Sequence, residues 1–194
     1  MARQDERLEL FEVVRTEYAA NSCLYPGCFV HITPAFVFPY TTFVDTDKRA
    51  KGFFGDPRTL AFLEAKKSYR QKPKIRFLAR DYSDELEIDT NHDLLVSQYA
   101  GFVSEHCKKY LRKGGILLAN NSHGDASLAS IDDDFRLIGV IKRQGEHFWI
   151  SKTKLDQYFV PARNVQVSRQ LLYAAKRGIG YKRAASNYIF EKLT

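Results

Sequence analysis

The stretch at residues 22–47, SCLYPGCFVHITPAFVFPYTTFVDTD, constrains the fold more than any other part of the chain. A short apolar run ends at a Pro–Gly pair, and a later apolar run ends in Asp45. Gly27 and Asp45 are 18 residues apart, close to the ~20 residues between a phosphate-side glycine and the acid that takes a ribose hydroxyl. The pattern predicts a strand, a glycine turn, a short crossover and a second strand that delivers an acid. Together these form half of a nucleotide-binding α/β unit.

Two residues of this stretch have the chemistry of a ligand site. Gly27 has no Cβ, so the backbone there can approach a ligand closely. The Asp45 carboxylate can accept hydrogen bonds from a cis-diol. The loop has one glycine where a dinucleotide fingerprint has three, and Pro26 removes a backbone donor. An ordinary strand–turn–strand with a solvated acid at its tip is the alternative.

Helical and strand patterns alternate along the rest of the chain. Strands are predicted at residues 22–28, 41–45, 74–80, 93–97, 116–119, 135–142 and 147–154. Helical spacing of apolar residues predicts helices at residues 5–19, 49–69 (interrupted at 55–57), 101–113, 126–131, 167–177 and 182–193. Only four residues separate the last two strands, too few for a parallel crossover, so these strands are predicted to pair as a hairpin.

Length and composition favour one soluble α/β domain. The 194 residues suffice for a sizeable core. No apolar run approaches the ~20 residues that a membrane helix needs, and the charged N-terminus has no signal-peptide core. Three cysteines without a CxxC pair indicate a reducing compartment and argue against a disulfide framework or a structural zinc site. We therefore expect a cytoplasmic protein with no metal centre.

The positive charge is concentrated at one end of the chain. The formal net charge is +7, and residues 141–194 contain 11 basic against 3 acidic residues. The densest basic cluster flanks residues 178–180 and consists of Lys176, Arg177, Lys182 and Arg183. Such a segment can attract nucleic acid or a phosphorylated small substrate. A solvated helical face is the alternative.

The order of elements resembles that of class I S-adenosylmethionine-dependent methyltransferases, in which five strand–helix steps precede an antiparallel hairpin. LRKGGILLANN (111–121) resembles their passage into the fifth strand, and HDLLVSQYAG (92–101) resembles the fourth strand. FVDTD (43–47) resembles the second strand with its terminal acid, and FLARDYS (77–83) resembles the third. The resemblance covers roughly residues 22–155. It implies a Rossmann-like three-layer α/β sandwich with a mostly parallel seven-stranded sheet and one antiparallel strand.

In terms of this resemblance, residues 1–194 form a single methyltransferase-like domain. An N-terminal helix lies within residues 1–21, the core spans 22–155, and a basic helical extension spans 156–194. The sequence departs from the family at the end of the first strand, which lacks the usual acid and has Tyr25 and Pro26 where small residues are expected.

The resemblance also implies roles for residues at the strand ends. The implied S-adenosylmethionine ligands are Tyr25, Gly27, Asp45, Asp81, Tyr82 and Ser97. The implied substrate contacts are His31, Gln98, Asn120 and Asn121, and the catalytic candidates are Tyr99 and His123. His123 lies in the polar run NNSHGD after the fifth strand, and histidine titrates in the range of a general base. Simple loop polarity is the alternative for His123, and a core position is the alternative for His31, which lies between Val30 and Ile32.

Three functions follow from these features. The first is a methyltransferase that uses S-adenosylmethionine and acts on a small molecule. A non-catalytic module with a decayed cofactor loop is the second, and a nucleic-acid-directed methyltransferase that uses the basic C-terminal helices is the third. SQYAG stands where enzymes that methylate amino groups of nucleic acids carry Asn-Pro-Pro-Tyr, which disfavours a DNA-base acceptor. The apolar residues of the C-terminal segment are expected to pack on the body or on a second subunit, so a homodimer stays open.

Overall fold

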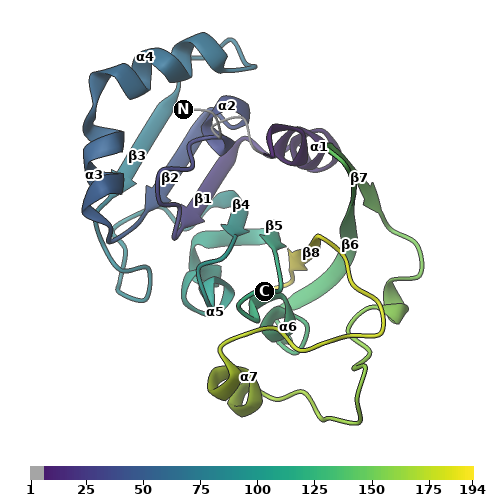
Figure 1. Cartoon of the computed structure of the whole chain (residues 1–194). Helices are drawn as coiled ribbons and strands as arrows, with labels where there is room; N and C mark the ends of the chain where they lie inside the picture. Colours follow the sequence, from purple (N-terminus) through teal and green to yellow (C-terminus); the bar gives the residue numbers. More distant parts are fainter. Residues whose placement is uncertain (1–6) are drawn as a thin grey trace.

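A computed structural model describes residues 7–194, which fold around one eight-stranded sheet (Figure 1). The strands are β1 (Ser22–Pro26), β2 (Tyr40–Val44), β3 (Lys74–Leu78), β4 (His92–Ser97), β5 (Leu111–Ala119), β6 (Phe135–Gln144), β7 (His147–Ser151) and β8 (Asn187–Lys192). Their order across the sheet is β3-β2-β1-β4-β5-β8-β6-β7. The chain order reverses between β1 and β4, and this switch point is where open α/β sheets bind ligands.

The first five strands form a parallel half, as the sequence predicted. β1 pairs in parallel with β2 and β4, β2 with β3, and β4 with β5. Leu24 and Cys23 are neighbours on opposite faces of β1, and both are fully buried. Such burial on both faces explains the continuous apolar runs of β1 and β4, because a parallel sheet is covered by helices on each side.

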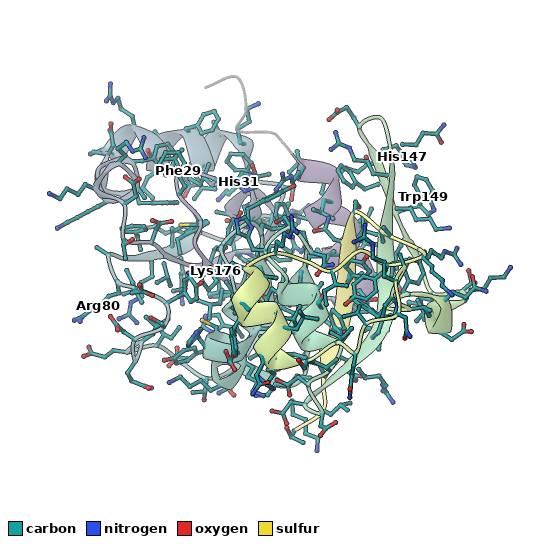
Figure 2. The ribbon with its side chains drawn as sticks, turned by 60° about the horizontal axis from the view of Figure 1, so that its bottom comes forward. Phe29, His31, Arg80, His147, Trp149 and Lys176 are labelled. Carbon is teal, nitrogen blue, oxygen red and sulfur yellow. The ribbon has the colours of Figure 1, made fainter. Side chains whose placement is uncertain are left out.

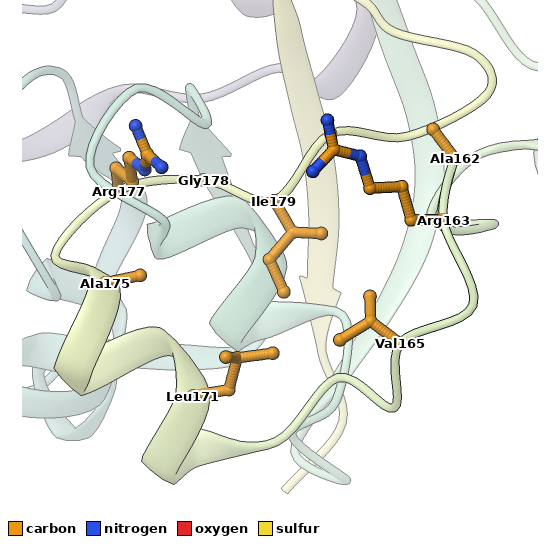
Figure 3. Close-up of a pocket in the computed structure, with 9 residues that line it drawn as sticks. Ala162, Arg163, Val165, Leu171, Ala175, Arg177, Gly178 and Ile179 are labelled. Carbon is orange, nitrogen blue, oxygen red and sulfur yellow. The ribbon is translucent and has the colours of Figure 1, made fainter.

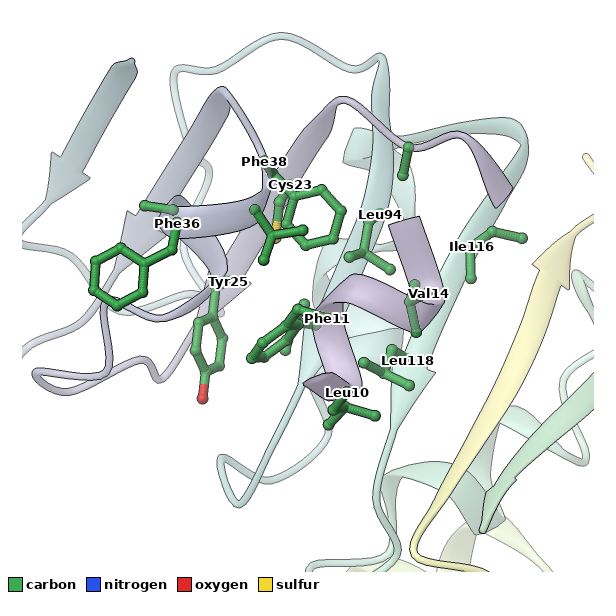
Figure 4. Close-up of a cluster of buried hydrophobic side chains, with 14 of the residues drawn as sticks. Leu10, Phe11, Val14, Cys23, Tyr25, Phe36, Phe38, Leu94, Ile116 and Leu118 are labelled. Atoms are coloured by element: carbon green, nitrogen blue, oxygen red, sulfur yellow. The ribbon is translucent and has the colours of Figure 1, made fainter. Parts of the chain in front are cut away.

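Helices cover the two faces of the sheet (Figure 1). They are α1 (Leu8–Tyr18), α2 (Pro34–Val37), α3 (Lys48–Gly55), α4 (Pro57–Lys66), α5 (Val103–Cys107), α6 (Asp125–Ala129) and α7 (Arg169–Ala175), with short 3-10 turns at Lys108–Tyr110 and Leu155–Gln157. One buried cluster joins α1 and α2 to one face, and a second joins α5 and α6 to the other. In Figure 4, Leu10, Phe11 and Val14 of α1 point into the first cluster.

Capping residues explain where the helices after β2 begin. Asp47 accepts a hydrogen bond from the Arg49 backbone N–H and starts α3, and Asp56 accepts one from Arg58 and starts α4. Pro57 occupies the first turn of α4, where its missing N–H is tolerated. The predicted interruption at 55–57 is therefore confirmed. The predicted helix at 5–19 is α1, and its residues 5 and 6 lie outside the described residues.

The predicted helix at 182–193 is wrong. Residues 187–192 are β8, which inserts between β5 and β6 and runs antiparallel to both. The run Tyr188-Ile189-Phe190 is apolar on both faces, and periodicity alone cannot separate such a short buried strand from a helix. The sheet therefore has eight strands instead of seven, and both β7 and β8 run against the others.

The helix predicted at 101–113 is also shorter than expected. α5 ends at Cys107, a 3-10 turn follows, and β5 already begins at Leu111. Gly114, predicted to stop a helix, lies inside β5 with a φ of +69°. The partner strand β4 has a register shift between His92 and Leu94, so this glycine belongs to an irregular part of the β4–β5 pair. Within residues 7–194, no helix is both long and apolar enough to span a membrane.

Candidate functional site

The loop after β1 makes a tight turn at the switch point of the sheet. Gly27 has a φ of +64°, and its N–H donates to the carbonyl of Val44 at 2.8 Å, so the turn is tied to the end of β2. Phe29 also has a positive φ, +47°. A bulky side chain rarely adopts this conformation, because its Cβ crowds the following carbonyl. The loop therefore keeps a glycine-like backbone at two alternate positions although only one of them is glycine.

Asp45 lies at the end of β2 and holds this loop in place. One of its carboxylate oxygens accepts the N–H of Phe29 at 2.7 Å, and the other accepts the N–H of Asp47 at 2.8 Å. The side chain is half-buried, whereas the Phe29 ring is 41% exposed and lies under the Arg49 guanidinium at 4.7 Å. The glycine turn and Asp45 therefore lie together, as the sequence predicted.

The chain after β4 closes over Gly27. A Cβ built on Gly27 would lie 2.2 Å from the Cβ of Ala100, so the two loops are in direct contact. The Tyr82 hydroxyl donates to the carbonyl of Ala100, and Gly101 next to it has a φ of +88°. Tyr82, one of the implied cofactor ligands, thus reaches across to the loop after β4 and holds it through this hydrogen bond.

Asp81 forms a local turn after β3. One of its oxygens accepts from both the backbone N–H and the hydroxyl of Ser83, at 2.9 and 2.7 Å. These hydrogen bonds lower the pKa of the Asp81 carboxyl. Asp81 lies at the carboxyl end of the sheet as predicted, but its side chain is engaged with its own loop.

Tyr25 is buried, and His31 is half-buried beside it. Tyr25 belongs to the cluster under α1, labelled in Figure 4, and burial raises the pKa of its hydroxyl. Its hydroxyl shares a hydrogen bond of 3.1 Å with Nδ1 of His31, and the His31 ring also lies 5.9 Å from the Phe11 ring. His31 thus packs against aromatic rings of the core while staying half-buried, and neither side chain lies in the polar cluster at the ends of β4 and β5.

Buried amides form a network at the ends of β4 and β5. Nε2 of Gln98 donates to Oδ1 of Asn187 at 2.6 Å, and Nδ2 of Asn120 donates to Oε1 of Gln98 at 3.3 Å. Oδ1 of Asn120 accepts from the backbone N–H and hydroxyl of Ser122. Sequence reasoning missed Asn187, because it lies in the segment predicted to be helical.

Tyr99 and His123 meet at the rim of the same edge. Tyr99 has a φ of +61° and is 56% exposed, and its ring stands edge-on to the His123 ring with 6.5 Å between centroids. The Arg7 guanidinium lies 4.9 Å from the Tyr99 ring. Nδ1 of His123 shares a hydrogen bond of 3.0 Å with the Ser122 hydroxyl. The two predicted catalytic candidates are therefore neighbours.

A cavity of about 360 Å³ opens beside these residues. Tyr99, Asn120 and Asn121 line one side, and the C-terminal segment around Ile179 and Tyr181 lines the other. Asn121 joins the two sides, because its Nδ2 donates to the Ile179 carbonyl at 3.4 Å. Three of the predicted site residues thus face one space.

Asp125 is a buried acid that was not among the predicted site residues. It is 2% exposed, and its carboxylate accepts from the backbone N–H and the hydroxyl of Ser104, the latter at 2.5 Å, and from the hydroxyl of Ser97. Burial raises the pKa of Asp125 to about 6. Ser97, predicted as a cofactor ligand, therefore points to Asp125. The polar run after β5 was the signal that could have revealed this acid.

The fold is shared with S-adenosylmethionine-dependent methyltransferases. It matches a candidate O-methyltransferase from Klebsiella pneumoniae with a TM-score of 0.52 at 11% identity, over 73% of this chain and 76% of that chain. The O-methyltransferase TomG from Streptomyces achromogenes, in complex with S-adenosylmethionine, matches with a TM-score of 0.49 at 11% identity, over 73% of this chain and 75% of that chain.

A candidate S-adenosylmethionine-dependent methyltransferase from Methanococcus maripaludis matches with a TM-score of 0.45 at 17% identity, over 63% of this chain. The present chain spans 60% of the length of that protein. Neither a protein-family model nor a curated protein matches the sequence. The chain therefore has the class I methyltransferase fold, as its sequence predicted, and the fold alone does not define its reaction.

The residues around Asp45 fit the ribose end of S-adenosylmethionine. Each Asp45 oxygen accepts one backbone N–H, and a carboxylate has about four acceptor positions, so lone pairs are left for a diol. Gly27 and Phe29 provide the sharp turn that a cofactor loop needs. Ala100 closes the space directly over Gly27, so the accessible part of the loop is at Phe29 and Asp45.

Proposed function

We propose that the chain binds S-adenosylmethionine at the carboxyl ends of β1, β2 and β3 and methylates a small molecule held above β4 and β5. The observation that carries this proposal is the position of Asp45, a half-buried carboxylate at the end of β2 beside a glycine turn at the switch point. The same proposal treats residues 1–194 as one domain, because β8 from the C-terminal segment completes the sheet.

The cofactor supplies an electrophilic methyl group, and the chain orients the acceptor. Asp45 accepts from the ribose hydroxyls, with Gly27 beneath and Asp81 and Tyr82 towards the adenine. The acceptor occupies the cavity lined by Asn120 and Asn121, whose amides suit a polar molecule. Gln98 holds Asn120 in position from below through the hydrogen bond between their amides.

In this proposal His123 accepts the proton from the acceptor. Its Nδ1 is engaged by Ser122, and Nε2 has no hydrogen-bond partner within residues 7–194. Tyr99 stands edge-on to the imidazole and limits its rotation. An imidazole with one nitrogen held and the other accessible is placed to act as a general base.

Calorimetric titration with S-adenosylmethionine and S-adenosylhomocysteine tests the cofactor site. Asp45→Asn is the informative variant, because the amide keeps one acceptor oxygen for the loop but loses the charge that favours a diol. We expect it to weaken cofactor binding about 10- to 100-fold, the scale of a lost charge-assisted hydrogen bond. Asp133→Asn, at an exposed residue in the turn before β6, is the matched control and should bind like the unmodified protein.

One observation favours a second candidate function, a non-catalytic methyltransferase-like module. Ala100 packs directly on Gly27, and a phenylalanine occupies position 29, where the backbone has a glycine-like conformation. Side chains therefore fill space that a glycine-rich cofactor loop leaves open. If the folded protein gives neither heat nor a thermal shift with either ligand at millimolar concentration, this second candidate replaces the first.

A further inference from the structure

A cavity of about 650 Å³ lies within the C-terminal segment, outside the proposed cofactor and acceptor sites (Figure 3). Cavities of ~300–1,000 Å³ hold small-molecule ligands. Its walls come from the loop before α7, from α7 itself and from residues 177–180 after it. The half-buried side chains of Val165, Leu171 and Ile179 give it an apolar wall.

Hydrogen bonds within the C-terminal segment and to the body of the protein fix the rim of this cavity. Tyr181 forms an antiparallel bridge with Pro161, and the N–H of Ala162 donates to the Gly180 carbonyl at 2.9 Å. The Tyr181 hydroxyl donates to the Ser127 hydroxyl at 2.8 Å. Gly178 packs so closely on Asn121 that a Cβ there would lie 2.0 Å from the Asn121 carbonyl oxygen. The rim is therefore built onto the loop after β5.

Two arginines give the cavity a positive charge that nothing in the described chain neutralises. In Figure 3, Arg163 and Arg177 stand on either side of Ile179, with Val165 and Leu171 below. Within residues 7–194 neither guanidinium forms an ion pair or a side-chain hydrogen bond, whereas the nearby Arg169 is paired with Glu105 and Asp132. None of the described lining residues is acidic.

We propose that this cavity binds an anionic amphipathic small molecule, whose carboxylate or phosphate lies between Arg163 and Arg177 and whose apolar part covers Val165, Leu171 and Ile179. A guanidinium matches both head groups because its N–H donors form a planar fork. Burial of a hydrocarbon chain against the apolar wall adds binding free energy that a plain inorganic anion cannot gain.

The cavity adjoins the proposed acceptor site. Ile179 and Gly180 line both this cavity and the 360 Å³ cavity that contains Tyr99, Asn120 and Asn121. A molecule anchored by the two arginines can therefore extend across residues 179–180 towards the strand ends. Only the identification of this molecule as the methyl acceptor rests on the proposed function, and the binding site itself does not.

The test is calorimetric titration of the full chain, without S-adenosylmethionine, with octanoate, octyl phosphate and 1-octanol. We expect the two anions to bind and 1-octanol to bind at least about ten-fold more weakly, because it lacks the charge. The double variant Arg163→Gln/Arg177→Gln should weaken anion binding about ten-fold or more and leave 1-octanol unchanged. Arg70→Gln, at an exposed arginine outside the lining, is the control and should have no effect.

The comparison of octanoate with octyl phosphate identifies the head group, and either preference supports the site. Equal binding of 1-octanol and octanoate would overturn the proposal, and so would equal octanoate binding by the double variant or no binding of either anion at millimolar concentration. Binding of mixed tRNA at low salt that the double variant loses, without octanoate binding, would replace the small molecule by nucleic acid. Because no cofactor is present, a failure here is distinct from a failure of S-adenosylmethionine binding.

Discussion

The parallel half of the sheet and the segment after residue 155 were predicted with very different success. In the parallel half, each strand was found from its own apolar run. In the C-terminal segment, α7 was expected near its place, but the second helix is β8, which lies between β5 and β6. The difference is one of range: a strand covered on both faces shows its burial locally, whereas β8 is defined by partners far away in the sequence.

The same contrast applies to the basic cluster. Lys176, Arg177, Lys182 and Arg183 are close in sequence, but they do not line one common cavity. Arg177 lines the large cavity of the C-terminal segment, whereas Lys182 and Arg183 line a different one beside Gln157. Figure 2 places Lys176 at the end of α7, on the face turned to the viewer. Density of charge along a chain therefore does not by itself establish a continuous basic surface, and the nucleic-acid alternative stays a prediction.

The largest expected change in stability comes from substitutions in the core. They test whether β8 contributes to the core as much as the parallel half does. Phe190 of β8 and Phe43 of β2 are both completely buried. Truncation of a buried phenylalanine to alanine costs ~3–5 kcal/mol, so Phe190→Ala and Phe43→Ala should lower the free energy of unfolding by similar amounts in urea titrations.

If Phe190→Ala costs less than about 1 kcal/mol while Phe43→Ala costs several, β8 is a peripheral addition to the sheet. Phe190→Leu and Phe43→Leu serve as milder substitutions, should either alanine variant fail to fold. Their midpoints in urea report the same comparison.

Particular elements show what could and what could not be predicted from the sequence. The interruption between α3 and α4 was predictable, because a capping aspartate and a proline at the first turn act locally. The start of β5 at Leu111 was not, because a Gly–Gly pair that commonly ends a helix here lies inside an irregular strand pair. The contact between the glycine turn after β1 and Asp45 after β2 was predictable, because both belong to one short stretch of sequence and follow adjacent strands. The contact of Asn187 with Gln98 was not, because it joins residues far apart in the sequence.

A smaller effect is expected at Asp125, which joins the two regions. The loop that begins with Asn120 bonds to the C-terminal segment through Asn121, whose Nδ2 donates to the Ile179 carbonyl. Asp125 at the end of this loop accepts from Ser97 and Ser104 in the parallel half. Burial raises the pKa of Asp125 to about 6, against about 3.9 for an unfolded aspartate. Between these pH values the folded state binds more protons than the unfolded state. The contribution of Asp125 to the free energy of unfolding therefore falls as the pH rises through this window.

Asp125→Asn should remove this pH dependence, because the amide is neutral and keeps an acceptor for Ser104. The free energy of unfolding of the variant relative to the unmodified protein should rise by about 2 kcal/mol between pH 4 and pH 7. Urea titrations across this range measure the difference. A difference that falls with pH would mean that the carboxylate is stabilised in its charged form by Ser97 and Ser104.

The smallest expected change in stability is at Phe29, in the loop after β1. Two substitutions there separate the contribution of the backbone conformation from that of the side chain. The φ of +47° at Phe29 costs a residue with a Cβ about 1 kcal/mol. Phe29→Ala and Phe29→Gly both remove the ring and its contact with Arg49, so the difference between them reports the backbone alone. We expect the glycine variant to be more stable than the alanine variant by about 1 kcal/mol.

The control is an extended position such as Tyr40 of β2. There the order should reverse, because glycine loses more conformational entropy on folding than alanine. If the alanine variant is the more stable one at Phe29 as well as at Tyr40, the backbone at Phe29 relaxes without cost and is not strained.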